Sequence, residues 1–119
     1  MSALVGKRIL IVEDEPIVAM CLEDMLQSLG CLIVGPAARL SEGLVLATNE
    51  QVDAAILDVN LGKDRSYPIA DLLRARSIPF VFATGYGRTD YATDPDAGLL
   101  EKPYTADQVR SVLAALMPG

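Results

Sequence analysis

The sequence predicts an α/β fold, a doubly wound five-stranded parallel sheet of the (βα)5 type with strand order 2-1-3-4-5. Short β-like runs alternate with segments of helical periodicity along all 119 residues. The runs are apolar almost throughout, which is typical of strands that helices cover on both faces. Five strands are expected, at residues 7–12, 31–35, 53–58, 79–83 and 98–101.

The first helix is expected to follow Pro16 and to end at Gly30. Its apolar stripe consists of Val18, Leu22, Met25, Leu26 and Leu29. A second helix is expected at residues 40–50 and a third at about 69–76.

The last helix begins with a capping-box pattern at Thr105 and Gln108. Its apolar face consists of Val109, Val112, Leu113 and Leu116. Residues 87–97, between the fourth and fifth strands, lack an apolar stripe, so the fourth helix is expected to be short or irregular.

Length and composition favour one globular domain, residues 1–119, because 51% of the residues are hydrophobic and no repeat or linker is evident. The apolar runs are too short to cross a bilayer and the N-terminus does not resemble a signal peptide, so we expect a cytoplasmic protein. Cys21 and Cys31 are interpreted as small buried residues without disulfide or thiolate chemistry.

The net charge of −6 and the lack of clustered basic residues argue against nucleic-acid binding. The chain has no histidine, which excludes His-ligated metal sites and Ser/His or Cys/His nucleophile pairs. Any phosphohistidine chemistry must therefore belong to a partner.

Polar residues stand at the ends of four of the predicted strands. Glu13-Asp14-Glu15 ends the first strand and Asp58 the third. Thr84 ends the fourth and Lys102 follows the fifth. Each residue alone has an ordinary structural explanation, as part of a solvated loop, a turn or a charged surface. Because the carboxyl ends of parallel strands meet at one edge, together they predict a functional crevice there.

The chemistry of this residue set suits phosphoryl transfer. Two carboxylates about 4 Å apart repel by roughly 4 kcal/mol at an effective dielectric constant of about 20, so Glu13 or Asp14 needs a cation to approach Asp58. An all-oxygen site with few protein ligands suits Mg²⁺, which can bridge to a phosphoryl oxygen. Asp58 can then act as the nucleophile, while Lys102 and Thr84 contact other phosphoryl oxygens.

Four ordered motifs resemble the receiver domains of response regulators in bacterial two-component signalling, a CheY-like, flavodoxin-like fold. They are Ile-Leu-Ile-Val-Glu-Asp-Glu-Pro at 9–16, Ala-Ile-Leu-Asp-Val-Asn-Leu at 55–61, Ala-Thr-Gly at 83–85 and Glu-Lys-Pro-Tyr at 101–104. The resemblance implies that Glu13, Asp14, Asp58 and the backbone carbonyl of Asn60 hold Mg²⁺ and that Asp58 is phosphorylated. It further implies that Thr84 is the switch hydroxyl, that Lys102 pairs with the phosphate, and that Pro103 follows a cis peptide bond.

One position departs from the family pattern. Receivers usually carry Tyr or Phe three residues before the lysine, and this chain has Leu99 there. The Phe-Ala-Thr-Gly stretch at 82–85 resembles a subgroup of single-domain receivers, several of which resemble partners of HWE-type sensor histidine kinases. Tyr86 is the candidate for the moving aromatic ring, and residues 87–97 for a segment that orders on phosphorylation.

The resulting hypothesis is a receiver that takes a phosphoryl group from a sensor histidine kinase in a phosphorelay and signals to a downstream protein by contact. It would catalyse only its own phosphorylation and dephosphorylation, with small phosphodonors also possible. The alternative is a small Mg²⁺-dependent α/β phosphatase or phosphotransferase with Asp58 as nucleophile, although haloacid-dehalogenase-like enzymes carry a second Asp where this chain has Asn60. A flavodoxin-like FMN binder is disfavoured because residues 13–15 would repel the phosphate.

Overall fold

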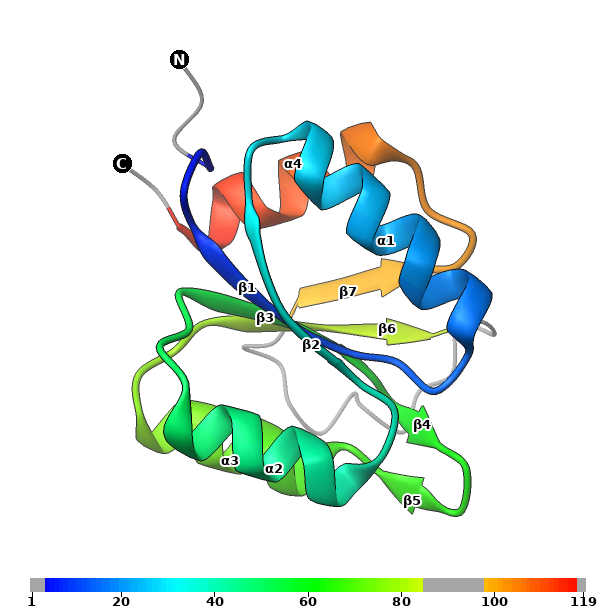
Figure 1. The fold of residues 1–119 in the computed structure, drawn as a ribbon, viewed down its shortest axis with the longest axis vertical. Helices are drawn as coiled ribbons and strands as arrows, with labels where there is room; N and C mark the ends of the chain where they lie inside the picture. Colours follow the sequence, from blue (N-terminus) through cyan, green and yellow to red (C-terminus); the bar gives the residue numbers. More distant parts are fainter. Residues whose placement is uncertain (1–3, 85–97, 118–119) are drawn as a thin grey trace.

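A parallel five-stranded sheet forms the centre of the protein in the computed structural model, which describes residues 4–84 and 98–117 (Figure 1). Its strand order is β2-β1-β3-β6-β7, and every neighbouring pair is parallel. The strands are β1 (Arg8–Val12), β2 (Leu32–Ala37), β3 (Ala54–Asp58), β6 (Phe80–Thr84) and β7 (Gly98–Glu101). In chain order these are the first to fifth strands of the sheet, so the predicted order 2-1-3-4-5 is confirmed.

Helices cover both faces of the sheet. Helices α1 (Pro16–Ser28) and α4 (Ala106–Leu116) lie on one face, and α2 (Leu40–Asn49) and α3 (Tyr67–Ala75) lie on the other (Figure 1). Alternate residues of β3 contribute to the two separate cores, Ile56 on the α1–α4 side and Leu57 on the α2–α3 side. Burial on both faces explains why the strands are apolar throughout.

Most predicted elements lie within two residues of their expected bounds. Helix α3 begins at Tyr67 instead of about residue 69, and β2 runs on to Ala37. The prediction for a short fourth helix concerns residues 87–97, which lie outside the described residues.

A small antiparallel hairpin was not expected from the sequence. It pairs β4 (Asn60–Leu61) with β5 (Asp64–Arg65), directly after β3. Gly62 in its turn has φ 65, a conformation that glycine adopts without a steric penalty. Strands of two residues carry no hydrophobic periodicity, so the pattern does not reveal them.

The two cysteines differ in burial, and both are free thiols. Cys31 is buried as predicted, and burial raises the pKa of its thiol. The prediction was wrong for Cys21, which is exposed on α1. The buried stripe of α1 contains Leu22 and Leu26, and Cys21 lies one residue, about 100°, around the helix from it.

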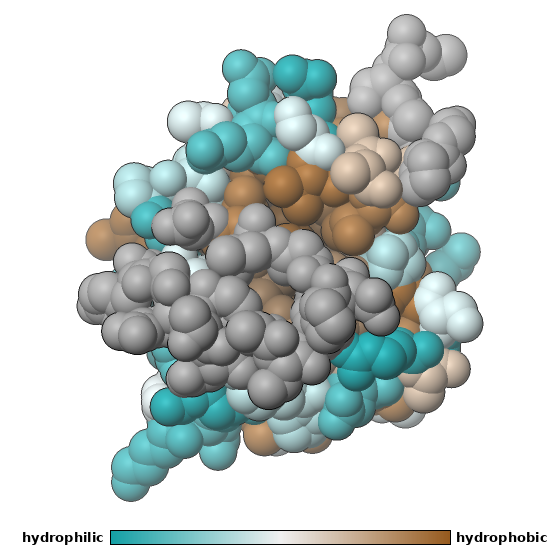
Figure 2. All heavy atoms as spheres, turned by 180° about the vertical axis from the view of Figure 1, so that it is seen from behind, coloured by the Kyte–Doolittle hydropathy of each residue, from teal (hydrophilic) through white to brown (hydrophobic). Residues whose placement is uncertain are grey.

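Among residues 4–84 and 98–117, no helix has the length and apolar character needed to cross a membrane. Figure 2 shows hydrophilic and hydrophobic side chains interspersed on the face opposite to the view of Figure 1. Two of the most exposed large apolar side chains, Ile17 and Met20, lie on α1.

The N-terminus of α4 carries the predicted capping box. The Thr105 hydroxyl accepts a hydrogen bond from the Gln108 backbone N–H at 3.2 Å, and the Gln108 side chain accepts one from the Thr105 N–H at 2.8 Å. Val109 and Leu113 are buried against the sheet, as expected. The cap therefore fixes where α4 starts, four residues after Lys102.

Thr105→Ala is expected to lower the free energy of unfolding by about 1 kcal/mol, because the Gln108 backbone N–H loses its side-chain partner. Thr105→Ser keeps the hydroxyl and should stay much closer to the unsubstituted protein. Urea unfolding of the three proteins measures both changes. Equal losses for the two variants would show that the methyl group, rather than the cap, stabilises this end of α4.

Candidate functional site

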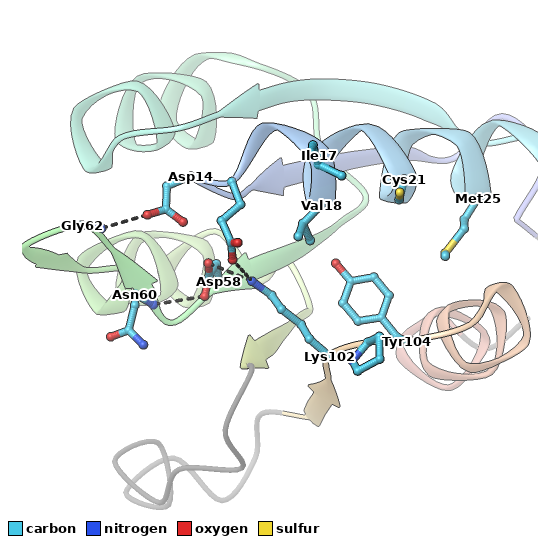
Figure 3. Close-up of a pocket in the computed structure, with 12 residues that line it drawn as sticks. Asp14, Ile17, Val18, Cys21, Met25, Asp58, Asn60, Gly62, Lys102 and Tyr104 are labelled. Atoms are coloured by element: carbon cyan, nitrogen blue, oxygen red, sulfur yellow. Dashed lines mark hydrogen bonds and ion pairs between the residues drawn. The ribbon is translucent and has the colours of Figure 1, made fainter.

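The carboxyl ends of β1, β3 and β7 deliver charged side chains to one edge of the sheet (Figure 3). Glu13 and Asp14 follow β1, Asp58 ends β3, and Lys102 follows β7. A pocket of about 690 Å³ opens at this edge. Its charged end is lined by Asp14, Glu15, Asp58 and Lys102, and its apolar end by Ile17, Val18, Cys21, Met25 and Tyr104.

The Lys102 ammonium lies between two buried carboxylates. Its Nζ is 2.7 Å from Glu13 Oε1 and 3.1 Å from Asp58 Oδ2. Glu13 is 3% exposed and Asp58 5%, so water screens these contacts weakly. One cation faces two acids, and this core of the site is therefore short of positive charge.

The pKa values reflect that shortage. Burial, followed by the hydrogen bond and negative charge of Asp58, raises the pKa of Glu13 to about 8, against the opposing effect of Lys102. For Lys102, burial alone would lower the pKa, but Glu13 and Asp58 together raise it above its usual value. The ammonium therefore stays charged, and the acidic side of the site favours a proton or a further cation.

Backbone N–H groups hold three of the carboxylates in place. The Gly62 N–H donates to Asp14 Oδ2 at 3.1 Å, and the Asn60 N–H donates to Asp58 Oδ1 at 3.2 Å. Glu13 Oε2 accepts from the Glu15 N–H at 3.1 Å. The β4–β5 hairpin thus orients two of the predicted acids, and the start of α1 orients the third.

The donor set fits a hard divalent cation. Carboxylate oxygens of Glu13, Asp14, Glu15 and Asp58 all lie within 4.8 Å of one another. Closely spaced oxygen ligands with room for water suit Mg²⁺, which keeps several waters in protein sites. Such an ion would also relieve the repulsion among these acids.

Thr84 is the last residue of β6 and is 1% exposed. Its backbone carbonyl accepts a hydrogen bond from the Lys102 N–H at 2.8 Å, which ties β6 to the start of the Lys102 turn. The Lys102–Pro103 bond is cis, in agreement with the sequence expectation. Tyr86 lies outside the described residues.

Three residues of this region were given no role in the site by the sequence. Glu15, which the sequence places in the acidic stretch after the first strand, has Oε1 3.5 Å from Lys102 Nζ. Tyr104 is buried, which with the nearby charge of Glu13 raises its pKa to about 12. Cys21 lies on the wall of the pocket, and its spacing of three residues from Val18 and four from Met25 is the signal that marks this flank of α1.

A family model described as the response regulator receiver domain matches residues 9–114. The chain belongs to the receiver family. Its function is accordingly that of a receiver domain, phosphoryl acceptance in two-component signalling. The family match also favours the receiver hypothesis over the phosphatase alternative.

Two curated regulators resemble this receiver. The phyllosphere-induced regulator PhyR of Methylorubrum extorquens is 32% identical over 120 residues, which cover 96% of this chain and 45% of PhyR. The transcriptional regulatory protein PdtaR of Mycobacterium tuberculosis is 33% identical over 109 residues, which cover 87% of this chain and 53% of PdtaR. The receiver thus spans about half the length of these relatives.

Solved structures of similar proteins share the fold over nearly the whole chain. The solution structure of SdrG from Sphingomonas melonis Fr1 has 48% identity and a TM-score of 0.84, covering 98% of this receiver and 99% of that chain. A BeF3-activated conformation of SdrG from Pseudomonas melonis Fr1 has 49% identity and a TM-score of 0.78, with the same coverage of 98% and 99%.

Lys102→Met is expected to lower the free energy of unfolding by about 3 kcal/mol at about pH 8 without Mg²⁺, because it leaves two buried carboxylates without their cation. The pKa of Glu13 is higher in the folded protein than in the unfolded chain, so a proton on Glu13 stabilises the folded state. This stabilisation is lost as the pH rises through the raised pKa. The loss should therefore be larger at about pH 9 than at about pH 6.

Urea unfolding at both pH values measures this effect, with Lys63→Met, a substitution at an exposed lysine of the hairpin turn, as the control. The control should stay within about 0.5 kcal/mol of the unsubstituted protein. A Lys102→Met variant as stable as the control at both pH values would contradict the account of the buried charges.

Proposed function

We propose that Asp58 is the phosphoryl acceptor of this receiver. The observation that carries the proposal is the position of its carboxylate, which contacts the Lys102 ammonium at 3.1 Å and shares a 4.8 Å cluster with three other acids. An acceptor needs a carboxylate at an open pocket, where a donor can reach it, beside cations that balance the added charge. Asp58 lines the pocket and meets both needs.

The transfer itself is a displacement at phosphorus. An Asp58 oxygen forms a bond to phosphorus while the bond to the donor's imidazole nitrogen breaks, and the nitrogen keeps that electron pair. Glu13, Asp14, Asp58 and the backbone carbonyl of Asn60 would hold Mg²⁺, which supplies positive charge to the phosphoryl oxygens. Lys102 exchanges carboxylate contacts for a phosphoryl oxygen, and the Thr84 hydroxyl donates to another.

The switch belongs to the same proposal. The phosphoryl group on Asp58 draws the Thr84 hydroxyl inward, and this movement pulls on Gly85 and Tyr86. Leu99 cannot supply the ring that swings in many receivers, so Tyr86 takes this role and residues 87–97 become ordered. The ordered segment then forms a surface for a downstream protein.

The partners follow from the absence of histidine in the chain and from its motifs. A sensor histidine kinase serves as the donor. The Phe-Ala-Thr-Gly stretch at 82–85 favours a kinase of the HWE type. Residues 1–119 act as a single receiver of that subgroup, in the cytoplasm, and transform no metabolite. The activated SdrG structure supports beryllofluoride as a mimic of the phosphoryl group for this chain as well.

Asp58→Asn should abolish labelling by acetyl phosphate in Mg²⁺, because the amide cannot act as the nucleophile. Intact-protein mass spectrometry measures the added phosphoryl group, and hydroxylamine should remove it from the unsubstituted protein. Asp71→Asn, which changes an exposed acid on α3, serves as the matched control and should label normally. Equal labelling of the Asp58→Asn variant, or labelling that persists without divalent metal, would overturn the assignment.

A further inference from the structure

Glu15 is an exposed carboxylate beside the buried part of the site. Its side chain is 64% exposed, yet its Oε1 lies 3.5 Å from Lys102 Nζ. One of its oxygens is also within 4.8 Å of a carboxylate oxygen of Asp58. Glu15 thus brings negative charge close to the acceptor from the solvent side.

The fold does not use this carboxylate in the way that its position would suggest. Glu15 is the N-cap residue of α1, but its side chain makes no capping hydrogen bond. Its backbone N–H orients Glu13, and its own carboxylate is directed instead to the Lys102 ammonium. The side chain is therefore available to act on what enters the pocket.

The other acids of the cluster are committed to contacts inside the protein. Glu13 is 3% exposed and lies 2.7 Å from Lys102, while Asp14 accepts a hydrogen bond from the hairpin at Gly62. Among the four acids of this cluster, Glu15 has both wide exposure and a contact with Lys102. Of the three acids that contact Lys102, Glu15 is the one whose carboxylate is most exposed to an approaching donor.

We propose that Glu15 is a specificity-determining residue that makes Asp58 favour phosphoramidate donors over acyl phosphates; this rests on the proposed acceptor role of Asp58. When an Asp58 oxygen displaces the leaving atom at phosphorus, the leaving group lies on the side away from Asp58, toward the opening of the pocket. A phosphoramidate donor leaves with its electron pair on a nitrogen that carries a proton, whereas acetyl phosphate leaves as the acetate anion. A carboxylate at the entrance stabilises the first and repels the second.

The charges of the intact donors act in the same direction. Acetyl phosphate carries two negative charges at neutral pH, whereas phosphoramidate carries a net single charge and a protonated nitrogen. A fixed negative charge at the entrance therefore lowers the local concentration of acetyl phosphate more than that of phosphoramidate. Glu15 also competes with the phosphoryl group for Lys102, but this competition affects both donors equally.

The test compares labelling rates of Asp58 by the two donors in Mg²⁺, followed by intact-protein mass spectrometry. Glu15→Gln should speed labelling by acetyl phosphate about threefold to tenfold and change labelling by phosphoramidate by less than about twofold. Glu15→Asp keeps the charge and should retain most of the original preference. Asp24→Asn removes the same charge from an exposed position on α1 and should leave the ratio of the two rates unchanged.

Ionic strength supplies a second readout that a purely structural role would not affect. At about 1 M salt the Debye length falls to about 3 Å, so the difference between Glu15→Gln and the unsubstituted protein should shrink markedly. If Glu15→Gln speeds labelling by both donors equally, the proposal is wrong, because the faster labelling would then come only from the release of Lys102. Loss of labelling by both donors, together with weaker Mg²⁺ binding, would overturn it by making Glu15 a metal ligand.

Labelling by the two donors distinguishes the role of Glu15 from the acceptor role of Asp58. If neither donor labels Asp58 in the unsubstituted protein, the acceptor assignment itself is wrong, and the donor preference is wrong with it. If both donors label Asp58 but the rate ratio is the same in Glu15→Gln and Asp24→Asn, only the role of Glu15 is wrong.

Discussion

The ammonium of Lys102 between the buried carboxylates of Glu13 and Asp58 is the interaction on which the site depends. Two acids that are almost inaccessible to water repel each other strongly, and one lysine with contacts of 2.7 and 3.1 Å offsets much of that repulsion. Burial, followed by the hydrogen bond and charge of Asp58, still raises the pKa of Glu13, so the site favours a proton or a further cation. A site with this deficit suits a divalent cation, whose charge would also offset that of an incoming phosphoryl group.

The parallel sheet makes this arrangement possible. Residues 13, 58 and 102 are far apart in the chain, and they meet because β1, β3 and β7 end at the same edge. Apolar cores on both faces hold the strands in register, so the charged ends have little freedom to separate. The β4–β5 hairpin and the start of α1 then supply backbone N–H groups that orient the carboxylates, which leaves the rigid sheet to set the distances.

Sequence reasoning predicted the sheet order and the meeting of Glu13, Asp14, Asp58 and Lys102, because strand periodicity and the common edge of a parallel sheet both follow from local patterns. It failed where the outcome depends on a single side-chain direction or on a few residues. Cys21 is exposed because it lies just beside the buried stripe of α1, and the hairpin after Asp58 is too short to show a pattern. The contact of Glu15 with Lys102 depends on how the chain enters α1, which composition does not encode.

A crystal structure of the protein with Mg²⁺ and beryllofluoride tests the central claim most directly. The account predicts that beryllium bonds to an Asp58 oxygen, and that Mg²⁺ lies among Glu13, Asp14, Asp58 and the backbone carbonyl of Asn60. Lys102 Nζ should then contact a fluorine in place of one of its present carboxylate contacts. Beryllofluoride bound at another carboxylate, or a Lys102 ammonium that keeps both carboxylate contacts and makes none to fluorine, would contradict it.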